Sequence, residues 1–216
     1  MTALAADFYD RPVLEVAPDL IGCVVRHGDT SAVIVETEAY HESEPACHAY
    51  AGLTRRTETL FGEPGRAYVY RSYGVHALLN AVCEPEGVGA AVLIRALAPV
   101  VGIDAMRARR GFSGDRGRGA RAARGARSVP GSGSRKAGWR EQDLCSGPGK
   151  LTQALGVRLT ENGSRLSSGP VRIRARAGAW RDPSVVEGTR IGITRAIELR
   201  WRFCVVGDRN VSRPRP

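Results

Sequence analysis

Apolar, β-branched residues recur in several short stretches of this chain, and they predict strands. Segments 23–27 and 31–39 flank a turn-prone Gly28-Asp29-Thr30, so they predict an antiparallel pair. Residues 68–80 alternate aromatic and polar positions around Tyr73-Gly74, which predicts a β-hairpin with Tyr73 at or near its tip. The run 90–97 is apolar except for Arg95 and predicts a central strand.

Three short helices are predicted by proline, capping and glycine signals at 10–21, 99–110 and 146–155. Asp10 and Ser146 are the expected N-caps of the first and third helices. Two further strands are predicted at 190–193 and 201–205. The last ten residues are expected to be frayed.

The positive charge of the chain is concentrated in two segments. The 216 residues carry a net charge of +10, and the pI is near 10.0, which favours a polyanionic partner. Residues 111–140 hold seven arginines and one lysine against one aspartate, and 209–216 add three arginines, so these segments account for the whole excess. Segment 111–140 is rich in Gly, Arg and Ala without a hydrophobic period, which predicts a disordered loop. We expect it to attract phosphates in a salt-dependent way.

Cysteine usage and hydropathy indicate the cellular compartment of the protein. The five cysteines are an odd number without a Cys-x-x-Cys pair, so neither a disulfide framework nor a thiolate metal site is indicated. No charged segment precedes an apolar core at the N-terminus, and no apolar run approaches the roughly 18 residues of a membrane span. The sequence therefore predicts a cytoplasmic protein without a membrane segment.

Segment 33–40 carries the first candidate chemistry. In a regular strand three of its polar side chains share a face: Glu36, Glu38 and Tyr40. Val35 and Thr37 would then point the other way. Two interpretations are open, an edge strand with a solvated acidic face or an acidic site beside the core. Arg95 bears on this choice, because a buried cation needs an acid, a ligand or water, whereas an arginine at a strand end reaches solvent.

Tyr73 and His48 also allow two interpretations each. An aromatic residue at a hairpin tip has little core to enter, so Tyr73 either packs on a neighbouring loop or inserts into a partner such as a nucleic-acid stack. His48 follows Tyr40 by eight residues, which is close enough to return to the same site, although a lone histidine is more often structural.

Taken in order, these segments resemble the alkyladenine (3-methyladenine) DNA glycosylase family. The resemblance covers nearly the whole chain outside 111–140 and rests on segments 35–40, 48, 68–80, 93–97, 144–151 and 190–192. It implies an α+β fold with a curved, mostly antiparallel β-sheet, short helices and a protruding β-hairpin. Residues 1–216 would form one domain, with 111–140 as a loop insertion and 209–216 as a basic tail.

The resemblance also implies catalytic roles. Glu38 matches the catalytic glutamate, which would accept a proton from the attacking water. Arg95 and the main chain of Ile191 match groups that help to hold that water. Spacing alone does not choose between Glu36 and Glu38, and only the resemblance selects Glu38. No lysine is placed to form a Schiff base, and no cofactor or metal is implied.

A base pocket and a wedge are implied as well. Tyr40, His48 and Tyr70 match the residues that sandwich an extruded base, and Asn80 matches the pocket floor. Aromatic faces suit a base made cationic by alkylation, since cation–π attraction adds about 0.5–2 kcal/mol. Tyr73 matches the intercalating tyrosine that fills the gap left by the flipped nucleotide.

The function expected from this resemblance is monofunctional base excision. The substrate would be double-stranded DNA containing damaged purines of the 3-methyladenine, 7-methylguanine and hypoxanthine class, and the protein would act as a monomer, associated with the nucleoid in a bacterium. Two alternatives remain open: a non-catalytic DNA-binding protein that uses the hairpin and the arginine-rich arms, and a different hydrolase on a related scaffold. The second alternative leaves Tyr73 without a purpose.

Overall fold

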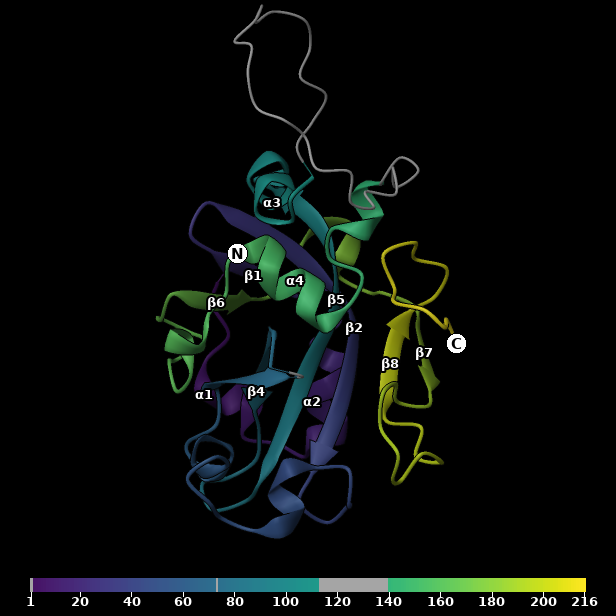
Figure 1. The fold of residues 1–216 in the computed structure, drawn as a ribbon. Coiled ribbons are helices and arrows are strands. Elements are labelled where there is room, and N and C mark those ends of the chain that lie inside the picture. The colour runs from purple at the N-terminus through teal and green to yellow at the C-terminus, as the bar shows by residue number, and fades with distance from the viewer. Residues whose placement is uncertain (1, 73, 113–139) are drawn as a thin grey trace, which may run out of the picture.

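Two long antiparallel strands form the centre of the fold (Figure 1). The computed structural model describes residues 2–72, 74–112 and 140–216. The central strands are β2 (Thr30–His41) and β5 (Ala90–Val101). The other strands in the described residues are β1 (Val24–His27), β3 (Ala67–Ser72), β4 (His76–Val82), β6 (Val171–Arg174), β7 (Val185–Gly188) and β8 (Arg202–Val205).

All strand pairs in this sheet are antiparallel, and the sheet is not closed. The order is β3-β4-β5-β2-β1-β6, while β8 pairs with the C-terminal half of β2 and carries β7 on its other side. The predicted turn at residues 28–29 joins β1 to β2, and the predicted hairpin is β3 paired with β4. The α+β prediction with a mostly antiparallel sheet is therefore confirmed.

Short helices complete the fold. They are α1 (Ala6–Tyr9), α2 (Val13–Asp19), α3 (Ile103–Arg109) and α4 (Pro148–Leu155), with 3-10 turns η1 (His48–Ala51), η2 (Glu58–Phe61), η3 (Glu141–Asp143), η4 (Leu159–Glu161) and η5 (Gly178–Trp180). Helix α2 buries its apolar stripe at a helical period: Val13, Val16, Ala17 and Leu20. The Thr37 hydroxyl of β2 donates to the carbonyl of Ala17 at 2.9 Å, which fixes α2 on this face of the sheet. Among the described helices, none has both the length and the hydropathy to cross a membrane.

Two facing β-bulges interrupt the pairing of β2 with β5. Ile34 pairs with Leu97, Glu36 with Ala96 and Thr37 with Ile94, so Val35 and Arg95 are the extra residues. The bulge at Val35 lets both Ile34 and Thr37 lie on the α2 side, while Glu36 and Glu38 lie on the opposite side, as alternation along the strand predicts. The regular-strand prediction for Val35 was wrong, since Val35 packs with Ala96 and Cys204 in a separate cluster.

The starts of all three predicted helices differ from the prediction. Asp10 follows α1, and Pro12 occupies the N-cap of α2. Ser146 is not a cap, because Gly147 holds that position and the Ser146 hydroxyl accepts from Lys150 instead. Pro99 lies inside β5, which pairs with β2 as far as Val101, and α3 begins only after Gly102 with its φ of +75°.

Two C-terminal predictions were also wrong. Residues 190–193 are not a strand; they form a loop beside β2, to which Arg190 and the N–H of Ile191 donate hydrogen bonds. The last ten residues are not frayed throughout, since Val211 and Ser212 are buried and Ser212 bonds to Glu36. The predictions for Tyr73 and for most of segment 111–140 concern positions outside the described residues.

Candidate active site

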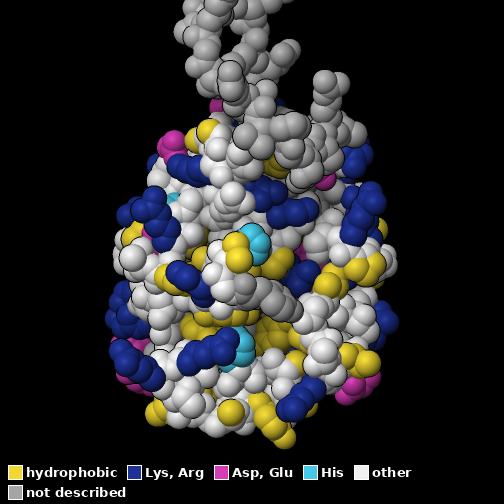
Figure 2. Space-filling model, in the orientation of Figure 1, with side chains coloured by type: hydrophobic (Ala, Val, Ile, Leu, Met, Phe, Trp, Pro, Cys, Tyr) yellow, Lys and Arg dark blue, Asp and Glu magenta, His cyan; other side chains and the backbone are white. Residues whose placement is uncertain are grey.

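A cavity of about 770 Å³ opens on the side of the sheet opposite α2. Its lining comes from β2 to β5, from the loops 45–48 and 191–195, and from the start of α4. Figure 2 shows hydrophobic side chains gathered in the hollow at the middle of this face, with Lys and Arg side chains around it. Six predicted site residues line the cavity: Tyr40, His48, Tyr70, Asn80, Arg95 and Ile191.

The strand register places one polar row across the floor of the site. Tyr68 pairs with Asn80, Asn80 with Leu93, and Leu93 with Glu38. The Asn80 side chain is fixed within this row, because its amide nitrogen donates to the main-chain carbonyl of Tyr68 at 3.0 Å. The sequence analysis missed Tyr68, although its alternation with Tyr70 puts both on one face.

Aromatic rings form one wall of the cavity. The rings of Tyr68 and Tyr70 stack with centroids 5.2 Å apart, and His48 meets Tyr70 edge-on at 4.7 Å. The Arg56 guanidinium donates to Nε2 of His48 at 3.2 Å, which assigns Nδ1 as the donor to the Tyr68 hydroxyl, also at 3.2 Å. Burial and the charge of Arg56 lower the pKa of His48. The imidazole therefore faces the cavity in its neutral form.

Tyr40 also lines the cavity, and a guanidinium supports its ring. The Arg190 guanidinium lies 4.7 Å from the centre of the Tyr40 ring. Arg190 forms a buried ion pair with Glu44 through contacts of 2.6 and 3.0 Å, and it donates to the carbonyl of Ala39 at 3.0 Å. Glu44 and Arg190 were both missed, because residues 146 positions apart give no local signal.

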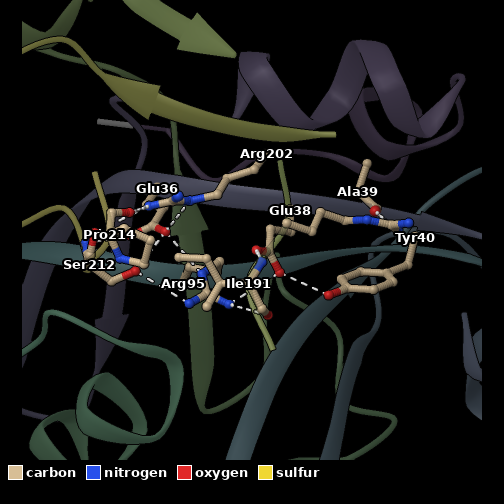
Figure 3. Close-up of polar contacts among 10 residues, drawn as sticks. Glu36, Glu38, Ala39, Tyr40, Arg95, Ile191, Arg202, Ser212 and Pro214 are labelled. Atoms are coloured by element: carbon tan, nitrogen blue, oxygen red, sulfur yellow. Dashed lines mark hydrogen bonds and ion pairs between the residues drawn. The ribbon is translucent and has the colours of Figure 1, made fainter. Parts of the chain in front are cut away.

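Glu38 lies beneath the cavity floor, and Figure 3 shows its contacts. One carboxylate oxygen accepts from the main-chain N–H of Ile191 at 2.7 Å. The other accepts from the Tyr40 hydroxyl at 2.8 Å and from Arg95 at 3.2 Å. Burial raises the pKa of Glu38, although these three donors oppose the shift. Burial and the Glu38 charge raise the pKa of Tyr40, so its O–H remains the donor.

Arg95 joins the two carboxylates of β2. Its Nε donates to Glu36 at 2.9 Å, while Nη1 reaches Glu38 at 3.2 Å and the Ile191 carbonyl at 3.4 Å. Burial on its own lowers the pKa of Arg95, but the carboxylates of Glu38 and Glu36 outweigh it, and the pKa is raised. The guanidinium is therefore a permanent cation, and of the partners left open for Arg95 the structure provides two acids.

Glu36 has a different environment from Glu38. Its carboxylate accepts from Arg95, from Arg202 at 2.7 Å, and from both the N–H and the hydroxyl of Ser212. Neither Arg202 nor Ser212 lines the cavity, whereas every residue that contacts the Glu38 carboxylate does. Both glutamates are fully buried, so the interpretation of an exposed acidic face is wrong.

Comparisons with known proteins identify the family of this chain. A family model described as Methylpurine-DNA glycosylase (MPG) matches residues 7–209. A relative from Rhodopseudomonas palustris is 46% identical over 209 residues, which cover 97% of this chain and 87% of the relative. Relatives from Methanoculleus marisnigri and Rubrobacter xylanophilus are 43% and 47% identical, over 97% and 91% of this chain and 98% and 90% of their own lengths. All three bear the name "Putative 3-methyladenine DNA glycosylase".

Proposed function

Because this chain belongs to the methylpurine-DNA glycosylase family, we propose that it excises alkylated or deaminated purines from double-stranded DNA by hydrolysis with an activated water. The substrate class is 3-methyladenine, 7-methylguanine and hypoxanthine. The protein acts as a monomer in the cytoplasm, on the nucleoid in a bacterium. Five buried cysteines, all free, fit a reducing compartment.

The observation that carries this proposal is the buried Glu38 carboxylate beneath an aromatic cavity. A glutamate with a raised pKa is a better proton acceptor than an exposed one, and its negative charge stabilises an oxocarbenium-like sugar. The water oxygen bonds to the sugar C1′, its proton passes to Glu38, and the N-glycosidic bond breaks with its electron pair leaving on the base. Arg95 and the main chain of Ile191 help to hold this water.

The cavity walls support recognition of a flipped purine. The base stacks between Tyr40 on one side and His48 with Tyr70 on the other. Neutral His48 adds no charge that would repel a cationic alkylated base, and the aromatic faces attract such a base. Asn80 lines the same cavity and would obstruct the exocyclic amino groups of normal purines, and Tyr73 would fill the gap in the duplex.

Hydrolysis by water fits the absence of a candidate amine nucleophile in the cavity. Within residues 2–72, 74–112 and 140–216 no lysine lines the cavity, and the ammonium of Lys150 bonds to the Ser146 hydroxyl at 3.3 Å. Without a Schiff base the enzyme leaves the sugar–phosphate strand intact.

Single-turnover base release tests the proposal. Wild type, Glu38→Gln and the exposed control Glu187→Gln are incubated with duplexes carrying 7-methylguanine or hypoxanthine. Because the amide of a glutamine side chain cannot accept the proton, we expect Glu38→Gln to release base at least about 100-fold more slowly, with lesion binding and Tm retained. The control should match wild type. If wild type binds the lesion without releasing the base, the non-catalytic DNA-binding alternative takes the place of the proposed function.

A further inference from the structure

Segment 209–216 docks against the buried charges of the site. Val211 packs with Val35, Ala96 and Cys204, and Ser212 is 5% exposed. Arg202 of β8 holds the same segment by donating to the carbonyls of Ser212 and Pro214 at 3.2 and 2.9 Å. This segment lies at the edge of the region that matches the family, since the match ends at residue 209.

Ser212 bridges two of the charged residues through a single hydroxyl. Its Oγ donates to Oε1 of Glu36 at 2.8 Å and accepts from Nη2 of Arg95 at 3.3 Å. Its N–H donates to the other oxygen of Glu36 at 2.7 Å. Figure 3 shows Ser212 on the far side of Arg95 from Glu38.

We infer that Ser212 is a positioning residue for the reaction of Glu38 and that it acts by keeping the Arg95 guanidinium in contact with both Glu36 and Glu38. The inference rests on the proposed function, because its readout is base release.

Glu36 and Glu38 compete for the single guanidinium of Arg95. Arg95 bonds to Glu36 through Nε and to Glu38 through Nη1, so a small rotation favours one carboxylate over the other. The Ser212 hydroxyl donates one hydrogen bond to the Glu36 carboxylate and accepts one from Nη2 of Arg95, which holds that nitrogen in place. Without it, Glu36 has one donor fewer and attracts Arg95 more strongly, and the contact between Arg95 and Glu38 weakens.

Weakening that contact has two consequences for Glu38. The group that holds the attacking water moves, so base release slows. The charge that lowers the proton affinity of Glu38 also recedes, so Glu38 takes up its proton at higher pH. A residue that only supports the fold would not move the pH dependence of the rate.

The test compares Ser212→Ala with the rescue variant Ser212→Thr and the matched neighbour Val211→Ala. Single-turnover base release is measured from pH 4 to 9, with lesion binding and Tm recorded for each protein. We expect Ser212→Ala to slow release about tenfold, to move the acid limb of the profile to higher pH and to leave lesion binding unchanged. Ser212→Thr keeps the hydroxyl, so it should restore the wild-type rate and the wild-type position of the acid limb. Val211→Ala should change Tm alone.

The outcomes that would overturn the positioning role of Ser212 can be told apart from the outcome that would overturn the proposed function. A wild-type profile for Ser212→Ala, or the same acid limb in Ser212→Ala and Val211→Ala, overturns the positioning role and leaves the proposed function intact. If wild type releases no base, both proposals fail together. If Ser212→Ala does not fold, Ser212→Cys takes its place, because a thiol of similar size is a weak hydrogen-bonding group and the same slowing and shift are expected.

Discussion

At the scale of single residues, two glutamates two positions apart on β2 have opposite surroundings. Glu36 is surrounded by donors from Arg95, Arg202 and Ser212, which neutralise it and fix the segment around it. Glu38 has fewer donors, and burial raises its pKa. A buried carboxylate with an incompletely compensated charge is suited to accept a proton, whereas a fully compensated one is suited to hold structure.

The pH dependence of base release should report Glu38 directly. With 7-methylguanine in duplex DNA, we expect the single-turnover rate to fall on the acid side with an apparent pKa above the ordinary glutamate value of about 4.3. Glu38 binds its proton more readily in the folded than in the unfolded protein, so its protonation in this range favours the folded state. The loss of rate should therefore occur without unfolding at this site, which circular dichroism over the same range would check. A rate that stays level down to pH of about 4.3 would contradict the assigned role.

At the scale of elements, the hairpin β3–β4 is held to the sheet by α4. Thr152 donates to the carbonyl of Ala77 at 2.6 Å, and Gly149 lies against His76 at the first position of β4. A Cβ added at Gly149 would lie 2.8 Å from Cγ and 2.9 Å from Cβ of His76. These atoms are near the backbone and cannot swing away, so glycine at 149 is required by the closeness of the helix to the strand.

The effect of Gly149→Ala on the free energy of unfolding should therefore depend on the residue at position 76. In the presence of His76 we expect the substitution to reduce the free energy of unfolding by about 1–3 kcal/mol through overpacking. In a His76→Gly background both Cβ and Cγ of residue 76 are absent, so the clash is removed, and the helix preference of alanine should make Gly149→Ala neutral or stabilising by up to about 1 kcal/mol. Urea unfolding of the four proteins measures both values. Equal effects in both backgrounds would show that the contact with His76 is not the cause.

At the scale of the whole molecule, basic side chains surround the cavity (Figure 2). The excess of positive charge in the sequence comes from segments 111–140 and 209–216. The positive groups around the cavity suit a duplex whose phosphates border a flipped nucleotide. We expect the arginines of 111–140 to add sequence-independent attraction and so to govern affinity for any DNA rather than discrimination of the lesion.

Replacing Arg121 and Arg124 by glutamine tests whether segment 111–140 governs affinity for any DNA rather than discrimination of the lesion. For undamaged duplex, the slope of log K against log salt should become shallower by up to about 1.8, because each lost phosphate contact removes about 0.9. The single-turnover rate at saturating enzyme should not change. A control with Arg26→Gln and Arg172→Gln, two exposed arginines on β1 and β6, should leave the slope near that of wild type. An equal change in both variants would mean that net charge alone sets the slope.

Local sequence by itself determined much of the sheet. The β1–β2 turn, the β3–β4 hairpin and the apolar β5 follow from alternation and turn residues, which act within a few positions. The sequence also showed that Arg95, if buried, would need an acid, a ligand or water, because an unpaired buried cation is costly wherever it lies. Helix starts were less predictable, since the antiparallel pairing of β5 overrode the helix signal of Pro99.

Only the tertiary structure decided what the two glutamates contact. Alternation placed Glu36 and Glu38 on one face, but the facing bulges at Val35 and Arg95 set which residues of β5 lie opposite them, and no local pattern specifies a bulge in advance. The partners that distinguish the two acids come from far along the chain, Ile191 for Glu38 and Ser212, 176 positions away, for Glu36. Such contacts are set by the packing of the assembled sheet, and so they become visible only when the chain has folded.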